Sequence, residues 1–171
     1  MKRILLLLIT TAIASFQSIA QTKISFDSPD VSFTFRRCTC KGNIAYIDFL
    51  ITNNGSSDLR GSVTYGKEPC SGFPGYYTAA YDDEGNVYTY NADKTKLSRI
   101  DIANEGPKGY ISDFSFHLPS GIPVKMRITL SGVDEYATEI SLLKVSFRSM
   151  NSPNVYGIAL LEAKNLPIER E

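Results

Sequence analysis

The strongest constraint on the fold of this chain is an alternation of apolar and polar residues that repeats every two positions. It is most regular over residues 124–130, which read VKMRITL. The same alternation recurs in three other segments, 31–35 (VSFTF), 45–51 (AYIDFLI) and 143–148 (LKVSFR). Successive side chains of a strand point to opposite faces of a sheet, so each segment is predicted to be a strand with one buried and one solvated face.

Turn-forming residues separate these segments, as in Asn53-Asn54-Gly55, residues 82–86 (DDEGN) and residues 119–121 (PSG). The two patterns together predict eight strands and a ninth, near residues 31–38, 43–53, 59–65, 76–81, 86–90, 110–118, 123–131, 140–148 and 155–163. Many short strands at this spacing are typical of an antiparallel β-sandwich. We expect a short helical turn within 133–139 and loose ends at 21–30 and 167–171.

The first twenty residues have the parts of a secretory signal peptide. Lys2 and Arg3 precede an apolar run at 4–9, and Ser18-Ile19-Ala20 supplies the small residues of a signal peptidase site. The apolar part is too short to cross a bilayer as a helix. We therefore expect cleavage between Ala20 and Gln21, a single β-sandwich domain over 21–171, no membrane span, and a secreted or periplasmic location.

The charge of the chain argues against nucleic acid as a partner. The sequence has 18 basic and 18 acidic side chains, and loss of Lys2 and Arg3 with the signal peptide would leave 16 against 18. Nucleic-acid-binding domains normally carry a basic excess. We expect instead an extracellular or periplasmic partner, either a protein or a glycan.

Three cysteines, Cys38, Cys40 and Cys70, would enter an oxidising compartment on export. Antiparallel strands at 43–53 and 59–65 would return the chain to the end where Cys38 and Cys40 lie. We therefore expect a disulfide from Cys40, or else Cys38, to Cys70. It would close a loop of about 30 residues and contribute about 3–4 kcal/mol in the chain-entropy model.

A zinc site is an alternative role for the cysteines. The same strand directions place His117, the one histidine, at the cysteine end, and three sulfurs with one imidazole would suit Zn²⁺. The C-x-C spacing is not that of a usual zinc site. No metal or other cofactor is therefore assigned.

Motifs of common enzyme classes are missing from the sequence. It contains no G-x-S-x-G elbow, no P-loop and no G-x-G-x-x-G fingerprint. His117 could serve in hydrolysis only beside an activated serine and an acid. Otherwise it is an exposed or hydrogen-bonded structural residue, and we assign no catalytic residue.

Residues 82–86 concentrate side-chain oxygens, which are the ligands of calcium. They lack the spacing of an EF-hand loop. A hairpin turn with Gly85 at positive φ accounts for the same residues without a metal.

Aromatic residues crowd the middle of the chain, where they form the candidate ligand-binding set Tyr65, Phe73, Tyr76, Tyr77, Tyr81, Tyr88 and Tyr90. Aromatic rings with polar tips are common at binding surfaces. They are also good strand formers, and alternate ones must then face the core. The sequence leaves both interpretations open.

Several segments resemble small secreted bacterial proteins with an immunoglobulin-like sandwich, many of unknown function. The segments are 18–21 (SIAQ), 47–55 (IDFLITNNG), 81–88 (YDDEGNVY) and 118–125 (LPSGIPVK), and the resemblance covers residues 31–148. It implies an antiparallel immunoglobulin-like β-sandwich and brings no catalytic residues with it.

Three functions follow as hypotheses. The first is an exported, non-enzymatic module that binds a protein or glycan. The second is a structural or assembly protein that self-associates through a sheet edge. The third is a hydrolase, which would need a cleft that combines His117 or a carboxylate pair with shifted pKa values.

Overall fold

The computed structural model describes residues 21–64, 77–89, 97–102, 113–149 and 158–171. In these residues the protein is all-β and contains no helix. Its eleven strands are β1 (Lys23–Phe26), β2 (Val31–Lys41), β3 (Ile44–Asn53), β4 (Leu59–Thr64), β5 (Ala79–Asp82), β6 (Val87–Thr89), β7 (Leu97–Ile102), β8 (Asp113–Leu118), β9 (Val124–Ser131), β10 (Glu139–Ser149) and β11 (Ile158–Arg170).

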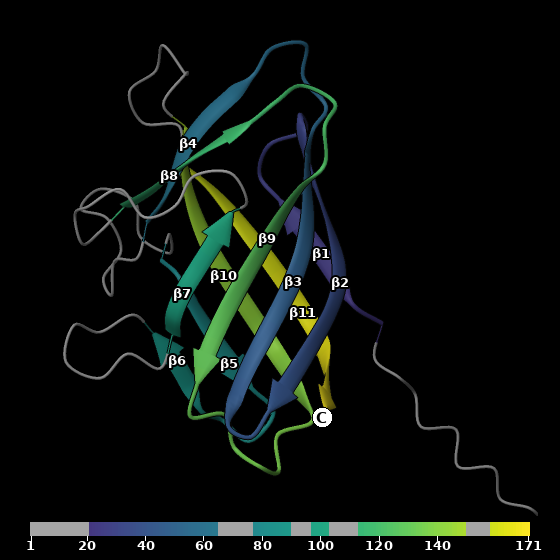
Figure 1. The fold of residues 1–171 in the computed structure, drawn as a ribbon, viewed down its shortest axis with the longest axis vertical. Helices are drawn as coiled ribbons and strands as arrows, with labels where there is room; N and C mark the ends of the chain where they lie inside the picture. Colours follow the sequence, from purple (N-terminus) through teal and green to yellow (C-terminus); the bar gives the residue numbers. More distant parts are fainter. Residues whose placement is uncertain (1–20, 65–76, 90–96, 103–112, 150–157) are drawn as a thin grey trace, which may run out of the picture.

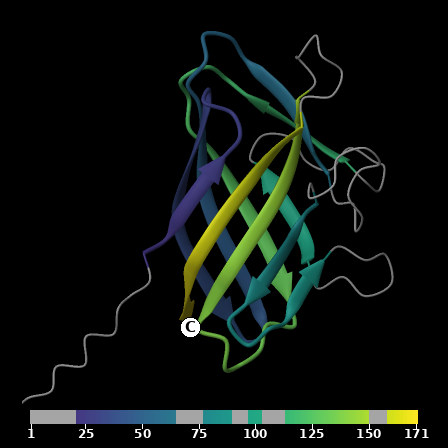
Figure 2. The same ribbon diagram turned by 180° about the vertical axis from the view of Figure 1, so that it is seen from behind.

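The strands form one curled sheet with the order β6-β5-β10-β11-β2-β3-β9-β7 (Figure 1). Three strands leave this path, because β1 pairs with β11, and β4 pairs with both β10 and β8. The curl brings β2, β3 and β9 opposite β10 and β11 across the core, and β1 runs beside β11 (Figure 2).

The sheet is mixed rather than wholly antiparallel. The first part of β11 pairs antiparallel with β10, but its last residues pair parallel with β2, with Ile168 opposite Cys38 and Arg170 opposite Cys40. The sequence pattern predicts the strands but not this pairing, because alternation does not encode which neighbour a strand takes.

In β3 and β9, the inward faces are those that the alternation predicts. In β3, Ala45, Ile47, Phe49 and Ile51 are buried, and β9 buries every second residue from Val124. Lys125 and Arg127 lie on the exposed face of β9, as expected.

A β-bulge changes the phase of β2. Phe33 and Phe35 pack against the core, whereas Arg36 and Arg37 are both exposed and Cys38 is buried again. The pairing with β3 shifts register between Phe35 and Arg37. One extra residue in a strand shifts the inward positions by one, so the bulge places two consecutive arginines on the outer face.

Both chain ends described by the structure are more ordered than the sequence suggests. Residues 21–30 contain β1, whose Ile24 and Phe26 pack against the core, and β11 continues to Arg170. Two hydrogen bonds from Arg170 Nη2, 2.5 Å to the carbonyl of Asp134 and 2.8 Å to that of Ala137, fix the end of β11. The expectation of loose ends was therefore wrong.

Two further expectations need correction. The segment 133–139 forms a turn at Glu135 and Tyr136 rather than a helical turn. Strands β1 and β7 were not predicted, because a pattern over only four or six residues gives a weak signal.

Candidate functional site

A pocket of about 390 Å³ opens at the end of the molecule where the chain turns from β1 into β2. Its wall is dominated by four phenylalanines from four different strands, Phe26 in β1, Phe33 in β2, Phe116 in β8 and Phe147 in β10. We call it the phenylalanine pocket.

The four rings form a continuous cluster around Phe147. Its ring centroid lies 5.7 Å from that of Phe26, 5.5 Å from Phe33 and 5.8 Å from Phe116. The contacts with Phe26 and Phe116 are edge-to-face, the geometry that aromatic quadrupoles favour. The wall is therefore preorganised and apolar.

The rings differ in their access to solvent. Phe116 and Phe147 are buried, whereas Phe26 and Phe33 are half-buried. Protein interiors are close-packed, so a hollow of this size with exposed aromatic edges is unusual for a core. It falls within the volume range of ligand pockets.

Charged residues stand at the mouth of the pocket. Asp27 accepts a hydrogen bond from the Leu160 amide at 2.9 Å and so ties the β1–β2 turn to β11. Asp30 and Arg148 also line the pocket, and their charged groups have no partner among the described residues. The rim therefore offers one carboxylate and one guanidinium beside an apolar wall.

The structure describes three of the seven predicted aromatic binding residues. Tyr88 is fully buried, and its hydroxyl donates to Asp82 Oδ2 at 2.6 Å, so it belongs to the core and not to a surface patch. The remaining four, Tyr65, Phe73, Tyr76 and Tyr90, lie outside the described residues.

Tyr77 and Tyr81 are half-buried and lie together. Their hydroxyls are 3.2 Å apart, and this hydrogen bond raises the pKa of Tyr81 to about 12. Lys144 Nζ lies 5.4 Å from the centroid of the Tyr77 ring and 3.0 Å from Glu162 Oε1. Tyr77 and Tyr81 are therefore the part of the predicted aromatic patch that the structure places at the surface.

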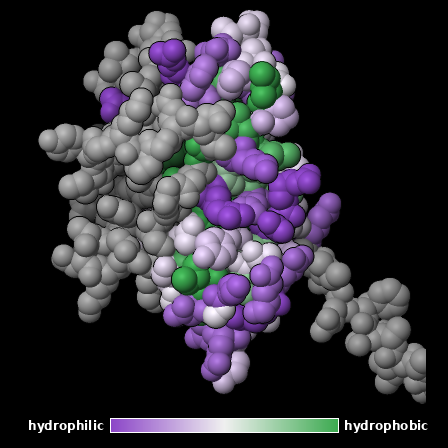
Figure 3. All heavy atoms as spheres, viewed as in Figure 1, coloured by the Kyte–Doolittle hydropathy of each residue, from purple (hydrophilic) through white to green (hydrophobic). Residues whose placement is uncertain are grey.

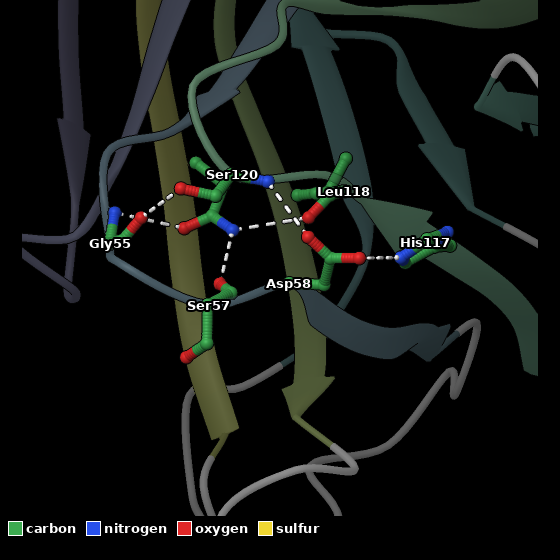
Figure 4. A network of polar contacts seen from close by, with 7 residues as sticks. Gly55, Ser57, Asp58, His117, Leu118 and Ser120 are labelled. Carbon is green, nitrogen blue, oxygen red and sulfur yellow. Dashed lines mark hydrogen bonds and ion pairs between the residues drawn. The ribbon is translucent and has the colours of Figure 1, made fainter.

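Among the residues that the structure describes, His117 has an acidic partner but no serine hydroxyl bonded to its ring (Figure 4). Its Nε2 lies 2.9 Å from Asp58 Oδ2, while Asp58 Oδ1 accepts the amide of Ser120 at 3.1 Å. The Ser120 hydroxyl instead donates to the Gly55 carbonyl at 2.5 Å.

This network joins the loop after β3 to the loop after β8. Asn53 completes it by donating to the carbonyls of Ser57, at 2.9 Å, and Leu118, at 3.1 Å (Figure 4). The amide of Ser120 and the imidazole of His117 hold the pKa of Asp58 below its usual value. We interpret the network as a clip that holds two loops together.

Cys38 and Cys40 are buried, and neither is bonded to another described sulfur. Cys70 lies outside the described residues, so its pairing with Cys40 stays a prediction. The described residues contain no group of three or more potential metal ligands.

The expected proximity of His117 to the cysteines was wrong. Cys40 pairs with Ala45 at one end of β3, whereas Leu118 contacts Asn53 at the other end. Eight residues of strand separate these points by about 26 Å. His117 therefore cannot join Cys38 and Cys40 in a zinc site.

The hairpin predicted at 82–86 is confirmed. Gly85 has a φ of 82°, and Asp82 accepts hydrogen bonds from both the amide and the side chain of Asn86. The Asp83 carboxylate accepts from the amides of Thr138 and Glu139. The carboxylate of Asp82 thus stabilises the turn, and that of Asp83 joins the turn to the start of β10.

Sequence reasoning did not find the phenylalanine pocket. The alternation already places Phe33 and Phe147 on inward faces, but the pocket exists because strand pairing brings them to one end of the fold together with Phe26 and Phe116. The available signal was the presence of phenylalanines at the ends of several strands. That signal could be interpreted only with knowledge of the strand order.

No protein-family model matches the chain, and no curated protein matches it. The described residues include no helix with the length and apolar character needed to cross a membrane.

Proposed function

We propose that this protein is an exported, non-enzymatic binding module and that the phenylalanine pocket receives an apolar side chain of a protein or peptide partner. The observation that carries the proposal is an apolar hollow of about 390 Å³ whose aromatic wall reaches the surface. Apolar pockets with a few polar groups at the mouth are the usual form of a ligand site.

The chemistry of the wall favours a peptide over a glycan. A glycan needs many hydrogen-bonding partners, whereas the wall offers mainly phenyl rings and aliphatic side chains. Asp30 and Arg148 at the rim can each accept or donate to the polar backbone that flanks an inserted side chain. A buried aromatic or aliphatic anchor with a polar rim is the common design of protein interfaces.

The immunoglobulin-like sandwich and export are parts of the same proposal. Their support is the all-β fold and the pattern of the first twenty residues. Intact-mass measurement of the protein recovered outside the cytoplasm tests export, and we expect the mature chain to begin at Gln21. A chain that retains Met1, or is found in the cytoplasm, would contradict it.

The absence of tryptophan from the chain provides a direct binding assay. N-acetyltryptophanamide is the probe, because all indole fluorescence then comes from the probe itself. We expect its emission to shift to shorter wavelength and its anisotropy to rise when the protein is added. An unchanged spectrum at millimolar protein and probe would refute an apolar side-chain site.

Variants on one strand locate the binding. Ala159 lines the pocket, so Ala159→Phe should fill it and weaken probe binding at least about tenfold. The matched control is Leu160→Phe, which adds a ring at the next position, on the opposite face of β11. Equal binding by the two variants would place the probe elsewhere.

A second pair of variants covers the case in which Ala159→Phe does not fold. Phe33→Ala removes part of the pocket wall, whereas Phe35→Ala removes a ring from the same strand that packs on Phe49 outside the pocket. The proposal requires that only Phe33→Ala weakens binding.

Self-association through a sheet edge is the second candidate function. Strand β7 ends the strand order and pairs only with β9 among the described strands. An unpaired edge can add a strand from another chain. Analytical ultracentrifugation tests this, since a strictly monomeric protein at high concentration would exclude it.

A further inference from the structure

A second hollow lies on the outer face of the sheet, away from the phenylalanine pocket. It has a volume of about 710 Å³ and crosses β2, β3 and β9. Figure 3 shows hydrophilic side chains gathered over the middle of this face. Its charged lining consists of Arg36, Arg37, Asp48, Lys125 and Arg127, and we call it the arginine groove.

The groove owes its charge to the bulge in β2. Without the register shift, Arg36 and Arg37 would point to opposite faces of the sheet, and one of them would enter the core. The bulge leaves both exposed on the same side. Bulges that re-aim side chains in this way are common beside functional sites.

Asp48 fixes two of the four cations. It accepts a hydrogen bond from Arg37 Nε at 3.2 Å and two from Arg127, at 2.6 Å from Nε and 2.8 Å from Nη2. The Arg127 guanidinium also lies 5.4 Å from the centre of the Tyr46 ring. Two guanidinium groups thus share one carboxylate, so the middle of the groove keeps a net positive charge.

The other two cations remain available for a ligand. Arg36 and Lys125 have no ion pair with the described residues. Two acidic positions flank the groove, Glu169 of β11 in register with Thr39 and Asp101 of β7 in register with Arg127, and neither is opposite Arg36 or Lys125. The groove therefore carries two cations without an ion pair among the described residues, one on β2 and one on β9, in addition to the positive cluster around Asp48.

The spacing of these two cations suggests the ligand. Their strands are separated by β3, which places the backbones about 10 Å apart. That separation is comparable with the length of a disaccharide unit. On β3, between the two strands, lies Asp48, whose carboxylate is held by Arg37 and Arg127 and can accept further hydrogen bonds from hydroxyl groups.

We propose that the arginine groove binds an acidic polysaccharide, with carboxylate or sulfate groups at Arg36 and Lys125 and sugar hydroxyls over Asp48. A polyanion without hydroxyl groups fits less well, because it has nothing to donate a hydrogen bond to Asp48. The balanced charge of the whole chain likewise argues against nucleic acid. This site is independent of the phenylalanine pocket.

The test compares tetragalacturonate with neutral galactotetraose by isothermal titration calorimetry at low and at 0.3 M salt. We expect binding of the acidic sugar only, weakened by salt because the contacts are exposed. Absence of tetragalacturonate binding at low salt, or equal binding of the neutral sugar, would overturn the proposal.

Charge-matched variants assign the binding to the groove. Arg36→Gln with Lys125→Gln removes the two available cations, and we expect affinity to fall about tenfold or more. Lys41→Gln with Lys164→Gln removes two exposed cations elsewhere and should change affinity less than about twofold. Equal losses would show non-specific attraction and refute the site.

Two further probes distinguish the class of polyanion. A tetraglutamate peptide and a single-stranded DNA tetranucleotide present carboxylates or phosphates on other backbones. Tighter binding of either one than of tetragalacturonate would refute the polysaccharide assignment.

Discussion

Replacing Gly61 by alanine should destabilise this protein, although the same change in an ordinary strand does the opposite. Glycine within a strand usually costs about 0.5–1 kcal/mol relative to alanine, because its backbone loses more freedom on folding. Gly61 lies in β4 between β8 and β10, opposite Phe116 and Ser149.

The atoms around Gly61 leave no room for a side chain, so alanine is expected to lower the free energy of unfolding here and not to raise it. A Cβ atom there would lie 2.5 Å from Cζ of Phe116 and 2.8 Å from the carbonyl oxygen of Arg148. The ring can move, but the carbonyl belongs to the backbone of β10 and cannot move without disturbing its pairing with β4. Overpacking of this kind costs about 1–3 kcal/mol.

We therefore expect Gly61→Ala to lower the free energy of unfolding by a net of about 1–2 kcal/mol. At roughly 2–4 °C per kcal/mol for a chain of this size, the melting temperature should fall by about 2–8 °C. Urea denaturation followed by circular dichroism gives the free energy directly. A variant as stable as the parent, or more stable, would refute the steric argument.

A double-mutant cycle separates the two contacts. Phe116→Leu removes the ring that meets the new methyl group, so Gly61→Ala should cost less in that background. Part of the cost should persist, because the Arg148 carbonyl is unchanged. Strict additivity of the two substitutions would show that the ring is not the obstacle.

Three other predictions concern the core, the arginine groove and the cysteines. Phe49→Ala should cost about 3–5 kcal/mol, because Phe49 is 1 % exposed, while Lys125→Ala should cost under about 0.5 kcal/mol; similar urea midpoints would contradict this assignment of faces. Hydrogen bonds from Arg127 and Arg37 lower the pKa of Asp48 below 3.8, so its contribution to stability is complete above that pH and is lost as the pH falls through the folded-state pKa. Asp48→Asn should therefore reduce the loss of stability in acid. An unchanged loss of stability in acid would contradict this prediction. Burial raises the pKa of Cys38 to about 12, so a thiol reagent at pH 8 should label it slowly in the native protein and quickly in urea, and rapid native labelling would show that the core is open there.

The sequence predicted the faces of the strands better than their neighbours. Alternation correctly assigned the buried residues of β3 and β9, and the turn at Gly85 was correct in both position and backbone conformation. These features depend on residues close together in the chain. The parallel pairing of β11 with β2 joins residues far apart, and no local pattern specifies it.

The candidate sites also divide into features that local sequence predicts and features that depend on strand pairing. Tyr88 was predicted among the binding residues from composition, but whether its strand turns it inward depends on β5 and β6 packing over the core. The phenylalanine pocket requires four strands to end at one place. The arginine groove had a sequence signal, since consecutive arginines interrupt the alternation of 31–40, but their pairing with Asp48 required the register of β3.

Strand β11 is the last of the eleven strands to be synthesised, yet it is hydrogen-bonded to β1, β2 and β10. Without it, β1 and β2 lose their hydrogen-bonded link to β10, and the strand order of the described sheet is broken between β10 and β2. A chain that lacks residues 158–170 therefore cannot close the sheet, whatever the quality of its individual strands. We therefore expect the sheet of a nascent chain to close only after β11 has been made.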